Sequence, residues 1–158
     1  MKKAMVPGSF DPITLGHLDL IERAASMFDL VYVTVMVNGE KNTRYTLEQR
    51  LQMACASLAH IKNVKVEASD GLLADFAAKR GVSVLVKGAR NGSDFEYEHM
   101  LAQINTELNP KLDTVVLPSR KETNYISSTY VRELIKYKKP LEGAVPQGAT
   151  ELIRKFEK

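Results

Sequence analysis

The chain has 158 residues, of which 44% are hydrophobic and 26% carry a charge, a composition typical of a globular domain and not of a disordered or fibrous chain. Its net charge of +3 is too small to indicate nucleic-acid binding, although it suits an anionic small substrate. The single cysteine, Cys55, excludes an internal disulfide, and no apolar run approaches the roughly 18 residues of a membrane span or forms a signal peptide. We therefore expect a cytoplasmic protein with no membrane partner.

Short apolar runs alternate with stretches of helical periodicity along the chain. In chain order we expect a strand over residues 4–6, a helix over 16–28, a strand over 30–37, a helix over 46–60, a strand over 63–68 and a helix over 72–80. They are followed by a strand over 83–86, a helix over 94–108, a strand over 114–117 and two helices over 127–138 and 148–156. Local signals support two boundaries: Thr46 and Gln49 form a capping box, and Gly81 ends a helix. Cys55 lies on the expected buried stripe of its helix.

The alternation of strands and helices with short connections predicts an α/β fold. With right-handed crossovers, residues 1–158 form a single doubly wound, Rossmann-like domain with a five-stranded parallel sheet and helices on both faces. Ligands bind beyond the carboxyl ends of the strands in such sheets. Four loops rich in polar and basic residues are expected to meet there, over residues 7–16, 38–45, 87–93 and 118–126.

The common nucleotide motifs are absent from the sequence. There is no G-x-G-x-x-G after the first strand, no P-loop, no Cys/His cluster for zinc and no G-x-S-x-G elbow. Two other clusters stand at predicted helix starts: TLGH, ending in His17, and ISSTYVR over residues 126–132. The free amides of a helix N-terminus bind phosphate groups, so both clusters indicate an anion site.

Each cluster also has a plainer interpretation. His17 alone reads as a solvent-facing residue at a helix start, and one hydroxyl among Ser127, Ser128 and Thr129 reads as an N-cap. Three hydroxyls in a row exceed what a cap needs, and both clusters fall in the same expected cleft. Function is therefore favoured for both.

Five stretches together carry a family resemblance: PGSFDPITLGH (7–17), TLEQR (46–50), VKGAR (86–90), DFEYE (94–98) and NYISSTYVRE (124–133). They resemble the T/H-x-G-H nucleotidyltransferase superfamily and, within it, the bacterial phosphopantetheine adenylyltransferases, over nearly the whole chain. The resemblance implies transfer of the adenylyl group of ATP to 4′-phosphopantetheine, giving 3′-dephospho-coenzyme A and pyrophosphate. It also implies Mg²⁺, a homohexamer and the penultimate step of coenzyme A synthesis. Inhibition by coenzyme A is plausible because the product shares its skeleton.

The resemblance also assigns residues. It places His17, Lys41 and Arg90 at the reacting centre. Phosphopantetheine would contact Ser9, Lys41, Leu73 and Lys87. ATP would contact Ser9, Phe10, His17, Gly88, Ala89, Arg90, Glu98, Thr123, Asn124, Tyr125, Ile126, Ser127, Ser128 and Thr129. No protein side chain is expected to be a direct metal ligand, because ATP phosphates and water can hold Mg²⁺.

Several positions depart from the family pattern or stay open. Lys87 stands where arginine is usual, which keeps the charge but loses the bidentate fork. Thr129 replaces a serine, and residues 91–93 replace a more apolar trio. Asp11 is interpreted first as a turn residue before Pro12 and second as a water-mediated metal contact.

Two other kinds of function remain as alternatives. One is a related transferase acting on nicotinamide mononucleotide, or using CTP on an alcohol phosphate. The other is a nucleotide-binding regulator without turnover.

Overall fold

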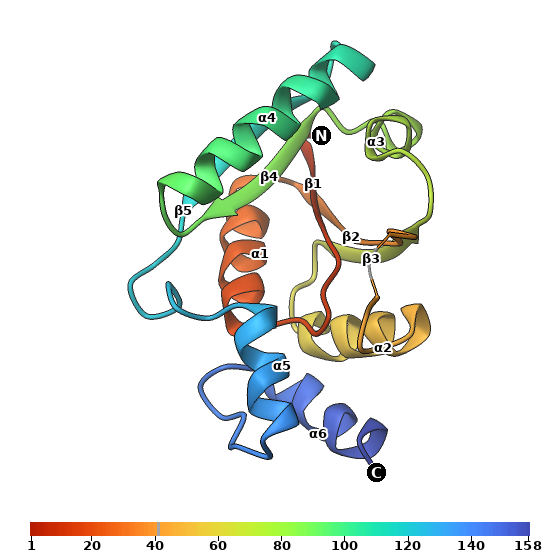
Figure 1. Cartoon of the computed structure of the whole chain (residues 1–158). Helices are drawn as coiled ribbons and strands as arrows, with labels where there is room; N and C mark the ends of the chain where they lie inside the picture. Colours follow the sequence, from red (N-terminus) through yellow and green to blue (C-terminus); the bar gives the residue numbers. More distant parts are fainter. Residues whose placement is uncertain (41) are drawn as a thin grey trace.

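Five parallel strands form one sheet. They run in the same direction because a helix after each strand carries the chain back to the end of the sheet at which the strands begin. The structure is a computed structural model that describes residues 1–40 and 42–158. In chain order its elements are β1 (Lys3–Gly8), α1 (Leu15–Met27), β2 (Leu30–Met36), α2 (Leu47–Leu58), β3 (Val64–Ser69), α3 (Leu73–Arg80), β4 (Val84–Ala89), α4 (Gly92–Leu108), β5 (Asp113–Pro118), α5 (Ser128–Lys136) and α6 (Gln147–Phe156). The strand order is β3-β2-β1-β4-β5 (Figure 1), so the predicted fold is confirmed.

The two faces of the sheet carry different helices. In Figure 1, α3 and α4 lie above the sheet, whereas α1 and α2 lie below it with α5 and α6 beyond them. Strand β2 shows how the sequence serves both faces: Val31, Val33 and Val35 enter the larger core with α1 and α2, and Tyr32 enters the smaller core with α3. Alternate strand residues point to opposite faces, so a continuous apolar run fits a sheet covered on both sides.

Local capping signals place the helix ends. The Thr46–Gln49 capping box is present at the start of α2, as predicted. Gly81 ends α3 in the left-handed conformation (φ 66), which glycine adopts without a Cβ penalty. Ser127 caps α5 by accepting a hydrogen bond from the Tyr130 amide at 3.1 Å. Hydrogen bonding within a few residues therefore sets these boundaries.

Several expectations were wrong. Pro7, Gly8 and Pro118 were expected in loops, but they end β1 and β5. Lys87, Gly88 and Ala89 were expected in a loop, but they continue β4, because they pair with residues 116–118 of β5. Cys55 was expected in the core, but it is exposed. The buried side of α2 is formed by positions 50, 53, 54, 57 and 58, so the helix is turned away from the predicted stripe.

The strand order locates the binding crevice. β1 lies between β2 and β4, and the chain leaves β1 toward one face through α1 and leaves β4 toward the other through α4. This is a topological switch point, where the loops at the carboxyl ends of the strands separate and leave a crevice. Among the described residues, no helix has both the length and the apolar character to cross a membrane.

Candidate active site

His17 is held by the backbone of its own helix start. The Thr14 amide donates a hydrogen bond to His17 Nδ1 at 3.0 Å, and the His17 amide donates to Thr14 Oγ1 at 3.3 Å. These two bonds form a capping box in which histidine takes the place usually occupied by Glu or Gln. Because a backbone N–H can only donate, Nδ1 is an acceptor and the ring proton lies on Nε2.

The surroundings keep this ring neutral. The pKa of His17 is lowered from 6.5 to about 4. Burial is the larger cause, and the positive charge of Lys87 is the smaller one. The ring of Phe10 packs edge-on against it, with the centroids 4.9 Å apart. Phe10 itself is 2% exposed and has a left-handed backbone (φ 48). His17 is therefore a fixed, neutral hydrogen-bond donor at near-neutral pH.

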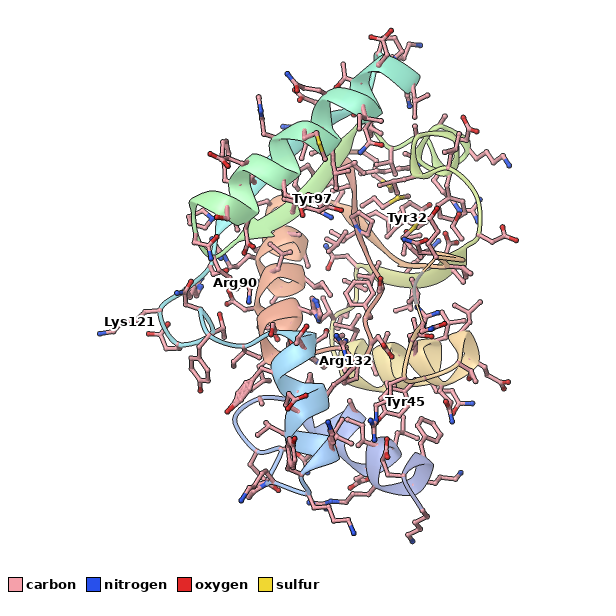
Figure 2. The ribbon with its side chains drawn as sticks, viewed as in Figure 1. Tyr32, Tyr45, Arg90, Tyr97, Lys121 and Arg132 are labelled. Carbon is pink, nitrogen blue, oxygen red and sulfur yellow. The ribbon has the colours of Figure 1, made fainter. Side chains whose placement is uncertain are left out.

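A cavity of about 330 Å³ opens beside His17 at the switch point. Its walls come from the end of β1, the first turns of α1, the ends of β4 and β5, the start of α4 and the residues before α5. The assigned residues that line it are Phe10, His17, Lys87, Gly88, Arg90, Glu98, Thr123, Ile126, Ser127 and Ser128. Figure 2 shows Arg90 where β4 ends, with Tyr97 farther along α4.

Cations and carboxylates are paired around this cavity. Arg90 Nε donates to Asp94 Oδ2 at 2.9 Å, and this hydrogen bond lowers the pKa of Asp94. Lys87 Nζ lies 3.4 Å from Glu98 Oε2. Such pairs orient the cations without neutralising the site permanently, because an arriving phosphate can compete for each cation.

A second, smaller cavity of about 30 Å³ adjoins the first. Leu73, Leu101 and Ala102 give it an apolar lining, and Lys87 and Glu98 belong to the walls of both cavities. The Lys87–Glu98 ion pair therefore stands between a polar space and an apolar one.

The structure places other assigned residues outside both cavity linings. They are Ser9, Ala89, Asn124, Tyr125 and Thr129. Ser9 follows β1, and its carbonyl accepts a hydrogen bond from Arg50 at 2.8 Å. Thr129 Oγ1 accepts one from Arg132 at 3.1 Å. Lys41 lies outside the described residues.

Sequence reasoning missed several polar groups in the large cavity. Asp19 and Arg23 of α1 line it, as does Ser119 after β5. Asp19 forms ion pairs with Arg23 at 3.3 Å and with Arg120 at 3.1 Å. Asp19 and Arg23 follow Gly16 at helical spacing, so the face of α1 that begins at the T-x-G-H motif was a signal for both. Ser119 had no comparable signal.

The carboxylates of the cavity suit a metal that arrives with the nucleotide. Asp19, Asp94 and Glu98 each face a cationic partner. Within the described part of the chain, no group of three or more His, Cys, Asp or Glu side chains is arranged to hold a metal ion. The oxygen atoms of these carboxylates are of the kind that Mg²⁺ takes as ligands.

Comparisons with known proteins agree with this fold and site. A family model described as cytidylyltransferase-like matches residues 5–134. A phosphopantetheine adenylyltransferase of Symbiobacterium thermophilum is 49% identical over 100% of this chain and 98% of its own length. Proteins of the same name from Clostridium kluyveri and Shouchella clausii are 42% and 39% identical, again over at least 97% of both chains. The crystal structure of a candidate nicotinate-nucleotide adenylyltransferase of Vibrio parahaemolyticus matches with a TM-score of 0.74 over 99% of this chain and 94% of its own, at 20% identity.

The crevice at the switch point, the T-x-G-H helix start and the family model define a cytidylyltransferase-like nucleotidyltransferase. The Vibrio structure supports the fold alone at its level of identity. The three relatives that match over their full length all have the same name, at 39–49% identity. The chain therefore belongs to the phosphopantetheine adenylyltransferase family of enzymes.

Proposed function

We propose that this protein transfers the adenylyl group of ATP to 4′-phosphopantetheine, releasing pyrophosphate and 3′-dephospho-coenzyme A. Identity of 39–49% along the whole chain to relatives named phosphopantetheine adenylyltransferase carries the proposal. The geometry of His17 is compatible with it, because a neutral donor beside a cationic cavity suits a reaction between two polyanions. The alternatives that use nicotinamide mononucleotide or CTP, or that lack turnover, gain no comparable support.

The reaction needs an electrostatic site more than a base. A phosphate oxygen of phosphopantetheine, already ionised near neutral pH, attacks the α-phosphorus of ATP. A new P–O bond forms, and the bond from the α-phosphorus to the bridging oxygen breaks, so pyrophosphate leaves with that electron pair. Negative charge grows on the α-phosphate oxygens in the transition state. His17 Nε2–H can donate a hydrogen bond to one of them without giving up its proton.

The cations would bring the two phosphates together. Arg90 would turn from Asp94 toward the ATP phosphates, and Lys87 would turn from Glu98 toward phosphopantetheine. Lys41 is proposed at the reacting centre on the resemblance alone. Mg²⁺, bound through ATP phosphates and water, would neutralise part of the triphosphate charge.

The small cavity, whose volume of about 30 Å³ equals roughly one water molecule, marks one point that the pantetheine arm could touch and does not enclose the arm. Its apolar wall includes Leu73, and Lys87 stands at its boundary with the large cavity. An acceptor whose phosphate meets Lys87 could therefore extend its arm along Leu73 and Leu101. This supports Leu73 and Lys87 as phosphopantetheine contacts.

A homohexamer in the cytoplasm is part of the proposal. Helix α4 buries no residue completely, and its outer side exposes Tyr97, Met100, Ile104 and Leu108 by 48–56%. A stripe of this kind is suited to another copy of the chain. The single cysteine fits a reducing compartment. Coenzyme A, which shares the product's skeleton, is proposed as an inhibitor.

One assay tests the reaction. The protein is incubated with ATP, Mg²⁺ and 4′-phosphopantetheine, and pyrophosphate and dephospho-coenzyme A are measured. Parallel reactions replace the acceptor with nicotinamide mononucleotide, or ATP with CTP. We expect product with ATP and phosphopantetheine. Product with nicotinamide mononucleotide and none with phosphopantetheine would refute the proposal, and no turnover with any pair would favour a regulator.

A further inference from the structure

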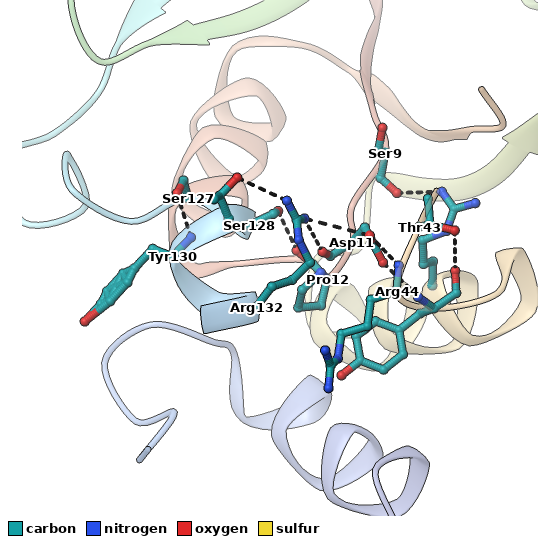
Figure 3. Close-up of polar contacts among 12 residues, drawn as sticks. Ser9, Asp11, Pro12, Thr43, Arg44, Ser127, Ser128, Tyr130 and Arg132 are labelled. Carbon is teal, nitrogen blue, oxygen red and sulfur yellow. Dashed lines mark hydrogen bonds and ion pairs between the residues drawn. The ribbon is translucent and has the colours of Figure 1, made fainter. Parts of the chain in front are cut away.

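The carboxylate of Asp11 binds the backbone of a distant loop. Asp11 is 5% exposed. Its Oδ2 accepts a hydrogen bond from the Arg44 amide at 2.9 Å, and its Oδ1 accepts one from the Tyr45 amide at 3.0 Å (Figure 3). The two amides belong to the segment between β2 and α2, more than thirty positions away in sequence. Asp11 thus joins the β1–α1 loop to the β2–α2 segment.

The backbone around Asp11 is tied to α5. Arg132 Nη1 donates to the Asp11 carbonyl at 2.8 Å, and Ser128 Oγ donates to the Pro12 carbonyl at 2.9 Å. Figure 3 shows both contacts reaching from α5 to the β1–α1 loop. The carboxylate therefore acts from a residue whose own main chain is fixed next to the Ser127–Ser128 wall of the cavity.

Arg50 ties the other end of the same segment. This arginine is 3% exposed, and its Nη1 donates to the Ser9 carbonyl at 2.8 Å and to the Met36 carbonyl at 3.2 Å. Met36 is the last residue of β2, so the segment is held to the β1–α1 loop where it begins as well as where it ends.

The contacts of Asp11 with Arg44 and Tyr45, called the anchor below, are supplemented by Glu157 at the end of α6. Glu157 accepts two hydrogen bonds from the Arg44 guanidinium, both at 2.8 Å, and one from the Tyr45 hydroxyl at 2.7 Å. Arg44 and Tyr45 thus donate hydrogen bonds to Asp11 from their backbone and to Glu157 from their side chains.

We propose that Asp11 is a positioning residue: its carboxylate holds Arg44 and Tyr45, at the end of the β2–α2 segment, against the loop that leads to His17. The inference rests on the proposed function for its consequence in catalysis. Lys41, which the resemblance assigns to the acceptor phosphate, precedes Arg44 by three residues in the sequence, so loss of the Asp11 contacts is expected to affect use of the acceptor. Both carboxylate oxygens are used as acceptors for main-chain N–H groups, which favours this role over a metal contact.

The test compares Asp11→Asn with Asp113→Asn. The first replacement turns one acceptor oxygen into an NH₂ group that faces an N–H donor, which removes one bond of the pair. The second is a control for the chemical change itself, because the exposed Asp113 accepts, among the described residues, a hydrogen bond from the amide of Thr114 alone, at 2.8 Å and at the opposite end of the sheet. Amide hydrogen exchange of Arg44 and Tyr45, KM and kcat for 4′-phosphopantetheine, affinity for α,β-methylene-ATP and the Mg²⁺ dependence are measured in both variants.

We expect exchange at Arg44 and Tyr45 to accelerate at least about tenfold in Asp11→Asn, because one hydrogen bond of the anchor is lost. The value of kcat/KM for phosphopantetheine should fall about 10–100-fold, while affinity for the ATP analogue stays within about twofold. The Mg²⁺ dependence should not move. Asp113→Asn should behave as wild type.

Two results would overturn the proposal. One is unchanged exchange at Arg44 and Tyr45 in a folded Asp11→Asn protein. The other is a shifted Mg²⁺ dependence with unchanged KM for phosphopantetheine, which would make Asp11 a metal contact. If Asp11→Asn does not fold, Glu157→Gln decides instead, with the same readouts and smaller effects. Because exchange needs no turnover, an enzyme inactive on phosphopantetheine would refute the proposed function and still leave the anchor tested.

Discussion

At the scale of single residues, His17 shows how a helix start can prepare a catalytic group. Its Nδ1 is occupied by the Thr14 amide, so only Nε2 can face the cavity as a donor. The T-x-G-H spacing puts the histidine at the N3 position of α1, where its amide reaches back to the Thr14 hydroxyl. One motif thus caps the helix, fixes the tautomer and aims the ring.

We predict that His17 does not titrate near neutral pH. Its pKa of about 4 lies below the ordinary 6.5, so between these values the unfolded chain binds the proton more readily than the folded one. The stability from this residue is complete above about pH 6.5 and is lost as pH falls through about 4. NMR of labelled imidazoles should show an Nε2–H tautomer throughout the range from about pH 5.5, roughly 1.5 units above the folded pKa, to about pH 8, roughly 1.5 units above the ordinary value. A titration near 6.5 would contradict the assignment.

Removing the His17 ring should slow the chemistry. His17→Ala is expected to lower kcat about 10²–10³-fold with little change in KM, because the lost hydrogen bond strengthens in the transition state. Steady-state kinetics with both substrates measure this. His60→Ala is the matched control, since that exposed histidine pairs with Glu22 at 3.0 Å away from the cavity. A His17→Ala enzyme with near-normal kcat would exclude the role.

Lys87 should matter more for the acceptor than for ATP. Lys87→Ala removes the cation at the boundary of the two cavities and leaves Glu98 unpaired. We expect kcat/KM for phosphopantetheine to drop about tenfold more than affinity for an ATP analogue. Lys87→Arg, which keeps the positive charge, should recover most of the loss. Equal losses for both substrates would argue against the assignment.

At the scale of elements, the C-terminal helix is packed against α2 without room for a side chain. A Cβ on Gly148 would lie 2.6 Å from the Ala56 carbonyl oxygen, which is backbone and cannot turn aside. The close approach buries Ala149 and Ile153 and places the end of α6 next to Arg44 and Tyr45. Packing of α6 is thus connected with the anchor of the β2–α2 segment.

Gly148→Ala should destabilise the fold. The added methyl group must separate α6 from α2, so we expect a loss of about 1–3 kcal/mol in the free energy of unfolding. Urea denaturation measures it. Gly92→Ala is the control, because nothing lies within 4 Å of a Cβ at the first position of α4. That replacement should be neutral or slightly stabilising, and equal effects of both would show that the contact in α6 is unimportant.

What could be predicted from the sequence was mostly local. The Thr46 cap, the Gly81 helix end and the alternation of elements depend on neighbouring residues, and they were predicted correctly. The extension of β4 depends on hydrogen bonds from β5, and the buried side of α2 depends on where α6 packs. The contact of Asp11 with residues 44–45 joins distant loops and leaves no local pattern. The cavity face of α1 could have been extended from Gly16 by helical spacing.

At the scale of the whole molecule, the two faces of the sheet are covered unequally. The α1 and α2 face has the larger core, whereas the outer side of α4 leaves an apolar stripe exposed. The stripe adjoins the binding site, because its Tyr97 also lines the large cavity and Leu101 and Ala102 of the same helix line the small one. Adjacent faces of one helix can therefore serve a binding site and an assembly surface.

Charge on that stripe should disrupt assembly. Ile104→Glu is expected to shift the protein from the proposed hexamer to smaller species, because in that assembly the carboxylate would be buried at the contact without a partner. Light scattering after size-exclusion chromatography measures the mass. Gln103→Glu adds the same charge beside the stripe and should leave the mass unchanged. A wild-type monomer, or an Ile104→Glu hexamer, would remove the stripe from the interface.

The Lys87–Glu98 pair also has a consequence for inhibitor design. A compound that binds Lys87 or Glu98 from either cavity meets two charges that lie 3.4 Å apart and already pair with each other. Such a compound must offer an anion to Lys87 and a donor to Glu98, or it leaves both charges without partners. Length alone will therefore not improve affinity. A linker that carries both groups at the right separation should bind tightly. It should bind less well to enzymes that lack an ion pair corresponding to Lys87–Glu98.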